Sequence, residues 1–119
     1  MGDLFNQYKW SELHEEQITP LLYRRVIWGK NQNLALFLFK KGSHISLHQH
    51  LSEQVTQVLK GTLRLIVAGE QIVLGVGEVL VIPPNTPHEA FADDDAEVLD
   101  SFSPRRDDWL NNEIDYMKK

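Results

Sequence analysis

Two histidines stand two residues apart in the stretch Gly42-Ser-His-Ile-Ser-Leu-His-Gln-His-Leu-Ser-Glu-Gln. Side chains two apart on a β-strand point to the same face, so His48 and His50 are expected to project together. Two neutral imidazoles on one face suit the binding of a single metal ion. The three residues after His50 are predicted to form a short bend, after which Gln54 opens the next strand.

A third histidine follows a rigid turn further along the chain. A lone pair of histidines on a strand is more often a surface feature than a metal site. Here, however, His88 follows Pro83-Pro-Asn-Thr-Pro, a run that fixes the direction of the chain. The separation of the two segments fits one hairpin plus one strand, so all three imidazoles are predicted to converge inside one barrel.

The elements that would position these residues are short strands. From residue 34 to residue 103 the chain alternates apolar runs with turns rich in Gly, Pro and Asp, a pattern typical of a β-sandwich or barrel. The predicted strands are Tyr23–Trp28, Leu34–Phe39, Val55–Leu59, Leu63–Ala68, Gln71–Leu74, Val79–Ile82, His88–Ala92 and Glu97–Ser103. No part of this region keeps a helical period for three turns.

The two ends of the chain differ from this pattern. Ser11–Glu16 is predicted to form a single helical turn capped by Ser11. Asp107–Met117 carries apolar residues at helix-compatible spacing, and a short C-terminal helix is predicted there. Those apolar residues are Trp109, Leu110, Ile114 and Met117.

Composition limits the classes of partner. The chain has 119 residues, enough for one domain, and its net charge of −5 argues against nucleic acid, which requires a basic patch. It has no cysteine, which excludes disulfides and thiolate ligands. The beginning of the sequence lacks the pattern of a signal peptide, and no apolar run has the roughly 20 residues that span a bilayer. We therefore expect a cytoplasmic protein that binds a small molecule, without membrane or nucleic-acid partners.

Two sequence motifs resemble those of the cupin superfamily. The first, G-x5-H-x-H-x3-E-x6-G, is matched by Gly42, His48, His50, Gln54 and Gly61; the second, G-x5-P-x-G-x2-H-x3-N, is matched by Gly77, Pro83 and His88. In the second motif, Asn85 replaces Gly and Ala92 replaces Asn. The resemblance to small single-domain cupins implies an all-β jelly-roll barrel (double-stranded β-helix) over about residues 24–103 of a single domain, 1–119. The tail, 104–119, would carry the short helix, and the resemblance also implies a homodimer.

The resemblance implies one divalent metal ion held by His48, His50, Gln54 and His88. Cupins usually have Glu where this chain has Gln54, and an amide oxygen is a neutral hard donor. The alternative ligand, Glu53, would reach the ion only through a bulge in the strand. Four neutral ligands leave the full charge on the ion, which favours an anionic or enolate-like ligand. Ni, Zn, Fe, Mn and Co all suit this donor set.

A narrower resemblance is to the KdgF group of cupins, which convert 4,5-unsaturated uronates from pectin or alginate into linear keto forms. It covers residues 24–117 and includes His-x-His-x-x-Glu-Gln-Val-Thr-x-Val-Leu-x-Gly and the tail Asp100-Ser-Phe-Ser-Pro-Arg-Arg-Asp-Asp-Trp109. The implied activity is a metal-dependent step on an acidic sugar. The alternatives are another cupin enzyme, such as an Fe(II) dioxygenase or a sugar isomerase or epimerase, and a non-catalytic binding module.

The tail also indicates chemistry by itself. Asp100 and Phe102 share one face of the last strand, and a carboxylate buried there is costly unless it is paired or used. Asp100 is therefore a candidate acid/base, or else the partner of Arg105 or Arg106 in a salt bridge. Arg106 is predicted to hold a substrate carboxylate, or else to pair with Asp107 or Asp108 at the surface. Phe102 is either a pocket wall or a core residue.

The predicted strand near the beginning of the chain carries two adjacent arginines. Arg24 and Arg25 point to opposite faces of that strand, so one of them is expected to face the barrel interior.

Overall fold

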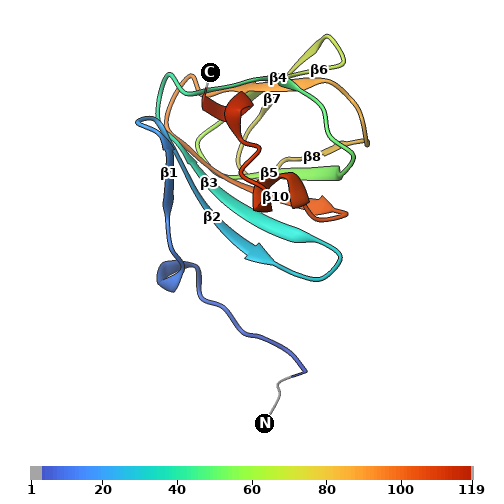
Figure 1. Ribbon diagram of the computed structural model, residues 1–119. Helices are drawn as coiled ribbons and strands as arrows, with labels where there is room; N and C mark the ends of the chain where they lie inside the picture. The colour runs from blue at the N-terminus through green and yellow to red at the C-terminus, as the bar shows by residue number, and fades with distance from the viewer. Residues whose placement is uncertain (1–3, 119) are drawn as a thin grey trace.

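The computed structural model describes residues 4–118 and shows two antiparallel sheets that face each other as a barrel (Figure 1). The larger sheet has the strand order β1-β2-β3-β10-β5-β8, and the smaller has the order β4-β9-β6-β7. The strands are β1 (Glu16–Thr19), β2 (Leu22–Trp28), β3 (Asn33–Phe39), β4 (His44–His48), β5 (Glu53–Lys60), β6 (Leu63–Val67), β7 (Glu70–Leu74), β8 (Val79–Ile82), β9 (His88–Phe91) and β10 (Ala96–Ser103). The predicted all-β barrel is confirmed.

Alternation of burial along the strands explains the barrel. In β3, Ala35, Phe37 and Phe39 are buried while the leucines between them lie on the outer face. In β10, Val98, Asp100 and Phe102 are buried on one face, as the sequence predicted. Because side chains alternate across a strand, the inner face of each sheet supplies the core.

Two of the turns that join one sheet to the other need special backbone conformations. Gly61, between β5 and β6, has φ of +76°, and a Cβ built there would lie 2.3 Å from the carbonyl oxygen of Asp95. Glycine is therefore required by both the backbone conformation and the close approach of the chain that precedes β10. Asn85, in the Pro-rich turn before His88, also has a positive φ, of 56°, which asparagine tolerates better than most residues.

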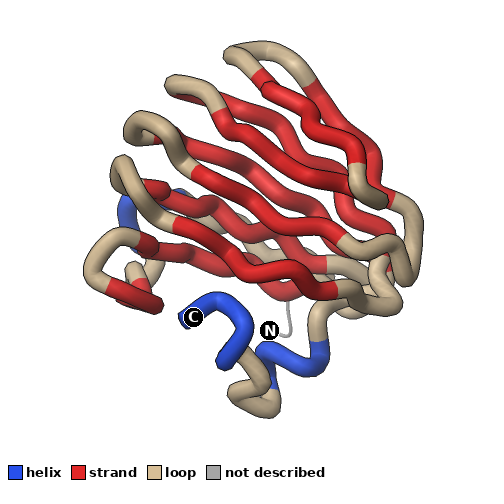
Figure 2. Tube along the Cα trace, turned by 90° about the horizontal axis from the view of Figure 1, so that it is seen from above, coloured by secondary structure: helices blue, strands red, loops and turns tan. Residues whose placement is uncertain are grey.

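The C-terminal tail forms two short helical pieces rather than the single predicted helix. These are α1 (Asp107–Leu110) and the 3₁₀ helix η2 (Asp115–Lys118). The helix ends because Asn112 adopts a left-handed conformation, with φ of 61°. Figure 2 shows the helical segments outside the layers of strands, and Figure 1 shows the tail crossing the open end of the barrel.

The beginning of the chain differs from the prediction in two ways. The helical turn is a 3₁₀ helix, η1 (Trp10–Glu12), so Ser11 lies inside it and Lys9 occupies the capping position without a side-chain bond. The barrel also begins earlier than residue 24, because β1 adds an edge strand to β2. Residues 1–3 and 119 of the predicted domain lie outside the described residues.

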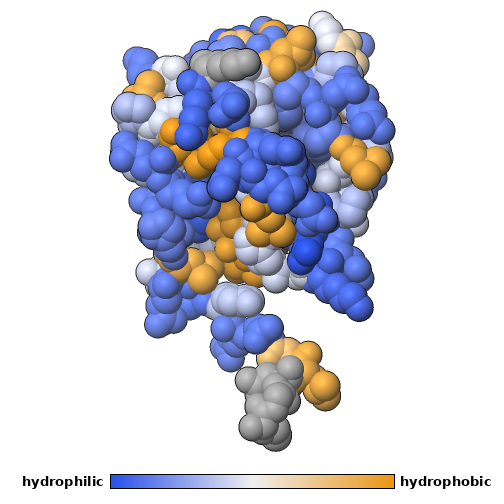
Figure 3. Space-filling view, in the orientation of Figure 1, coloured by the Kyte–Doolittle hydropathy of each residue, from blue (hydrophilic) through white to orange (hydrophobic). Residues whose placement is uncertain are grey.

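Residues 4–15 include an extended arm that projects from the barrel (Figure 1). Figure 3 shows apolar surface on this arm, where Leu4 and Phe5 are 100% and 80% exposed. Between residues 4 and 118, no helix is long and apolar enough to cross a membrane.

Candidate metal centre

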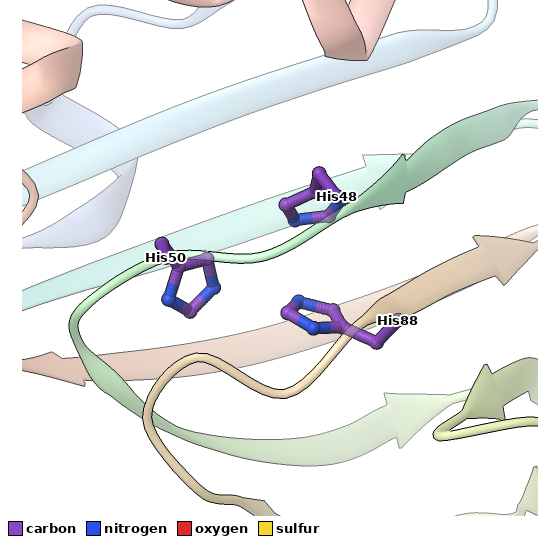
Figure 4. Close-up of side chains that lie close together, drawn as sticks. All are labelled: His48, His50 and His88. Carbon is purple, nitrogen blue, oxygen red and sulfur yellow. The ribbon is translucent and has the colours of Figure 1, made fainter.

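The three predicted histidines converge at the open end of the barrel. One ring nitrogen from each histidine lies within 4.8 Å of the corresponding atom of the other two, a separation that lets one metal ion contact all three. Figure 4 shows the rings of His48, His50 and His88 turned toward a common centre. His48 ends β4 and His88 begins β9, where the two residues are direct cross-strand partners. His50 lies in the loop after β4 and not on the strand, so the argument from strand alternation was wrong for it.

Backbone carbonyls fix the orientation of each imidazole. The Nδ1 atoms of His48, His50 and His88 lie 2.7, 2.9 and 2.8 Å from the carbonyl oxygens of Ser46, Ser52 and Thr86. A carbonyl can only accept, so Nδ1 carries the proton and the lone pair lies on Nε2. Metal-binding histidines in proteins are oriented in this manner. The Nε2 atom of His88 is buried and has no hydrogen-bond partner among the described residues, as expected of a ligand atom.

Gln54 directs its carbonyl oxygen at the same centre. Its Oε1 lies 3.0 Å from Nε2 of His50, while its amide nitrogen donates to Oγ1 of Thr56 at 2.9 Å. With Nδ1 of His50 protonated, both Nε2 of His50 and Oε1 of Gln54 present lone pairs, and a metal ion beside them would accept both. Glu53 is exposed at the first position of β5 and lies outside the pocket, so the bulge that would bring it inward is absent.

The histidines are kept neutral, as metal ligands must be. Burial, together with the neighbouring His88, lowers the pKa of His48 from 6.5 to about 3. Burial and the charge of Arg106 lower the pKa of His50 to about 4. Burial also lowers the pKa of His88. The donor set is therefore three neutral imidazoles and one amide oxygen, which fits a divalent transition metal.

A hydrogen-bonded chain connects the metal centre to Asp100. The Thr56 hydroxyl lies 2.6 Å from Oδ1 of Asp100 and accepts a hydrogen bond from the Gln54 amide. Burial raises the pKa of Asp100 to about 7, against the hydrogen bonds from Thr56 and Gln54 that lower it. A carboxyl group with this pKa can take up and release a proton near neutral pH.

The salt-bridge alternative for Asp100 is wrong, because both nearby arginines have other partners. Arg105 donates to Asp107, and Arg106 donates through Nε and Nη2 to Asp108 at 2.9 and 2.8 Å. The prediction that Arg106 pairs with Asp107 or Asp108 at the surface is confirmed for the pairing with Asp108. It is wrong for the location, because Arg106 is buried. Its backbone N–H donates to the Asn33 side chain, which fixes where the tail leaves β10.

Phe102 is both a core residue and a pocket wall. It is 2% exposed, its ring meets the His50 ring edge-on at 5.6 Å, and the Arg106 guanidinium lies 5.0 Å from its centroid. The interior pocket is lined by side chains from both sheets and the tail, Phe102 among them. His50 and Arg106 also border an outer groove between the loop at 49–52 and the tail at 104–108.

Of the two adjacent arginines, Arg24 faces the interior side of β2. It is buried, pairs with Glu16, and places its guanidinium 4.3 Å from the Trp109 ring centroid. Arg25 bonds to the carbonyl oxygen of Trp10 near the end of the arm. Arg24 supports the tail and does not line the metal pocket.

Two residues at the centre were not predicted from the sequence. Thr56 lies two positions after Gln54 on β5, so strand alternation alone places it on the same face. Tyr116 stacks on His48 with 4.2 Å between ring centroids and accepts hydrogen bonds from Arg106 and Trp109. Nothing in the sequence signalled Tyr116, because its position depends on the break between α1 and η2.

Comparisons with known proteins agree with this geometry. The pectin degradation protein KdgF of Dickeya dadantii (strain 3937) is 28% identical over 98 residues, which cover 80% of this chain and 89% of that protein. The structure of KdgF from Halomonas sp. has a TM-score of 0.78 and 31% identity, over 84% of this chain and 95% of that one. An RmlC-like cupin from Shewanella frigidimarina NCIMB 400 has a TM-score of 0.81 and 27% identity, over 91% and 96%.

The family assignment rests on the match of a whole domain. The cupin domain family matches residues 35–102, which run from within β3 to the penultimate residue of β10 and include all three histidines. Together with the two-sheet barrel and the converging imidazoles, this match shows that the chain belongs to the cupin domain family, and within it resembles KdgF.

Proposed function

We propose that this protein is a metal-dependent enzyme that converts 4,5-unsaturated uronates, such as those from pectin, into their linear keto forms. One observation carries the proposal. The pocket lined by His48, His88 and Gln54 also contains a buried carboxyl group, Asp100, whose pKa is raised to about 7 by burial. Similarity to the two KdgF proteins supports the same reaction.

The proposed metal ligands are His48, His50, His88 and Gln54. When bound, a divalent ion supplies Lewis-acid polarisation of substrate oxygens. Because all four ligands are neutral, the centre keeps a net positive charge and attracts an acidic sugar. Arg106 adds a second positive charge at the pocket wall. Its Nη1 makes no hydrogen bond to any residue between 4 and 118, which leaves it available to the C6 carboxylate.

Asp100 is the proposed acid/base. It takes the proton of the hydroxyl on C1 as the bond between C1 and the ring oxygen breaks, so that C1 becomes an aldehyde. The electron pair of that bond stays on the oxygen attached to C5, which gives an enolate across C4 and C5. Asp100 then delivers its proton to C4, and a ketone forms at C5. The step is an isomerisation without net gain or loss of atoms, protons or electrons.

The function is tested by the ultraviolet absorbance of 4,5-unsaturated galacturonate, since the conjugated double bond disappears in the reaction. We expect the absorbance to fall faster with the protein than in the spontaneous reaction, and a chelator to slow it. A rate equal to that of the blank, with metal fully bound, would contradict the proposal. Oxygen uptake with iron would instead favour a dioxygenase, and tight binding of galacturonate without product would favour a binding module.

A further inference from the structure

The second helical piece of the tail closes the barrel over the metal centre. Residues 113–118, called here the closing segment, include η2, which contacts β4 and β1. Met117 is 1% exposed and lies in the hydrophobic core, so the segment is inserted and not merely laid on the surface. Figure 1 shows it at the open end of the barrel.

Tyr116 connects this segment to two groups of the site at once. Its ring lies nearly flat on His48, with 4.2 Å between centroids and 27° between planes. Its hydroxyl accepts hydrogen bonds from Nη2 of Arg106 at 2.7 Å and from Nε1 of Trp109 at 2.9 Å. Tyr116 thus covers the centre in two ways. Its ring packs on the candidate ligand His48, and its hydroxyl is hydrogen-bonded to the buried Arg106.

Little room remains in the pocket while Tyr116 is in place. Only about 30 Å³ of the interior is open to the centre of a water molecule. This volume holds a few waters at most, which is too little for a sugar ring or a chelator. A ligand larger than water therefore reaches the interior only if a side chain or a segment moves.

The segment is built to move separately from the barrel. Outside η2 itself, the described backbone bonds of the segment run from the Glu113 N–H to the Asp108 carbonyl and from the Met117 N–H to the Ile114 carbonyl, and the segment is not paired with any described strand. Before it, Asn112 adopts a left-handed conformation. The preceding helix α1 stays anchored by Trp109, which is buried and has the guanidinium groups of Arg24 and Arg106 4.3 and 4.6 Å from its ring. Segments with few backbone bonds open locally at low free energy.

We propose that the closing segment opens and closes over the metal centre, and that Tyr116 is the residue that holds it shut. The hydroxyl of Tyr116 occupies one N–H of Nη2 on Arg106 next to the free Nη1. A carboxylate of a ligand takes that position through both nitrogens and replaces the hydroxyl. This inference goes beyond the proposed function, because it applies to any small anionic ligand.

The first test follows metal loss and needs no substrate. The protein is loaded with Ni²⁺ and mixed with excess EDTA, and the rate of Ni²⁺ transfer is measured. We expect Tyr116→Ala to release the metal about tenfold faster than the parent chain, because the ring and its hydrogen bonds no longer hold the segment. Tyr116→Phe should release Ni²⁺ at a rate between those of the parent chain and Tyr116→Ala, since it keeps the stacked ring but loses the hydroxyl. Tyr8→Ala, in the exposed arm, is the matched control and should release metal at the parent rate.

The second test measures opening directly and leaves Tyr116 unchanged. The chain has no cysteine, so a single Met117→Cys thiol reports on the closing segment alone. The control is Val98→Cys, which is fully buried in β10 and is exposed only when the barrel unfolds. In native buffer we expect the thiol at 117 to react with DTNB at least about tenfold faster than the thiol at 98, each rate being normalised to that in urea.

Two results would overturn the inference. Equal DTNB rates at positions 117 and 98 would mean that the segment opens only when the whole barrel unfolds. Parent-like Ni²⁺ release from a folded Tyr116→Ala would mean that the ion leaves through the outer groove beside His50 instead. Neither measurement involves a uronate, so failure of the proposed reaction and failure of this inference are separate outcomes.

Discussion

Thr56 and Asp100 are direct partners on neighbouring strands, and the hydroxyl of Thr56 lies 2.6 Å from Oδ1 of Asp100. Both side chains point into the barrel, where the carboxyl group forms no salt bridge with any residue among 4–118. The hydroxyl therefore stabilises the ionised form of a carboxyl group that burial otherwise keeps protonated. This pair sets the pH at which Asp100 can act as a base.

Replacing Thr56 should shift the pH dependence of the proposed reaction. Thr56→Val keeps the shape of the side chain but removes the hydrogen bond that lowers the pKa of Asp100. We expect the acidic limb of the pH–kcat profile to move upward by about one pH unit, the effect of one hydrogen bond to a charged group. The measurement is the absorbance assay at a series of pH values. Thr62→Val, in the exposed turn, should leave the profile unchanged.

Removing the charge of Asp100 should abolish turnover without removing the metal. Asp100→Asn keeps the side chain's volume and cannot exchange a proton, so we expect kcat to fall by about 10²–10⁴-fold. Bound metal, measured by elemental analysis, should stay at the parent level because Asp100 is not a proposed ligand. Asp94→Asn, in an exposed turn, serves as the control. Normal activity of Asp100→Asn would sink the mechanism.

The identity of the fourth ligand can be tested by exchanging amide and carboxylate. Gln54→Glu adds a negative charge at the centre, and we expect it to tighten metal binding by about tenfold or more in a chelator competition. The same variant should weaken binding of an anionic sugar, because the net positive charge falls. Glu53→Gln, one residue earlier and on the surface, should change neither quantity. If Glu53→Gln weakened metal binding and Gln54→Glu left it unchanged, the fourth ligand would be Glu53.

Acid should destabilise the metal-free protein through its histidines. In the folded state the pKa values of His48 and His50 are about 3 and 4, against 6.5 in the unfolded chain. Between pH 6.5 and 4 the unfolded state therefore binds more protons, so stability rises with pH and is lost as pH falls. Over the same range the raised pKa of Asp100 acts in the opposite direction, so from pH 7 to pH 4 we expect a net loss on the order of 2 kcal/mol, measured by urea unfolding after chelation. His48→Gln should flatten this dependence; an unchanged slope would contradict the assignment.

The turn at Gly61 should tolerate no side chain. Gly61→Ala would place a Cβ 2.3 Å from the Asp95 carbonyl, whereas at Gly69 a Cβ meets nothing within 4 Å although both glycines have positive φ. Alanine at either position strains the backbone, but only alanine at position 61 also clashes with a neighbour. The difference between the two variants therefore measures the steric clash alone. We expect Gly61→Ala to unfold about 5 °C or more below Gly69→Ala in a thermal scan. Equal midpoints would show that the turn adjusts without cost.

Much of the fold could be predicted because its signals are local. Alternating apolar residues and turns rich in Gly and Pro placed β8 at its observed bounds, and placed the other predicted strands to within two residues at either end. One short strand was not predicted. β1 lies where a helical turn and a Pro breaker dominated the sequence pattern, and it forms only because it pairs with β2. Pairing of this kind is a tertiary effect that a single segment does not encode.

The site was predictable where residue type alone carries the chemistry. Three histidines, one amide and one buried carboxylate were found from motif and strand parity. The position of His50 in a loop and the contacts of Tyr116 could not be found in this way. Both depend on how the chain turns after β4 and after Trp109. The spacing of apolar residues predicts helices and strands but not the backbone geometry of such turns.

The imidazole orientation described above has a consequence for how such a centre evolves. Each ring is fixed by a main-chain carbonyl of its own neighbourhood, so no side-chain substitution can remove those three anchors directly. If Gln54 is the fourth ligand, as proposed, the net charge of the centre then depends on one replaceable position, residue 54. A single exchange of the amide for a carboxylate there would lower the net positive charge of the centre and weaken its attraction for acidic ligands. The scaffold and the three imidazole rings would stay the same.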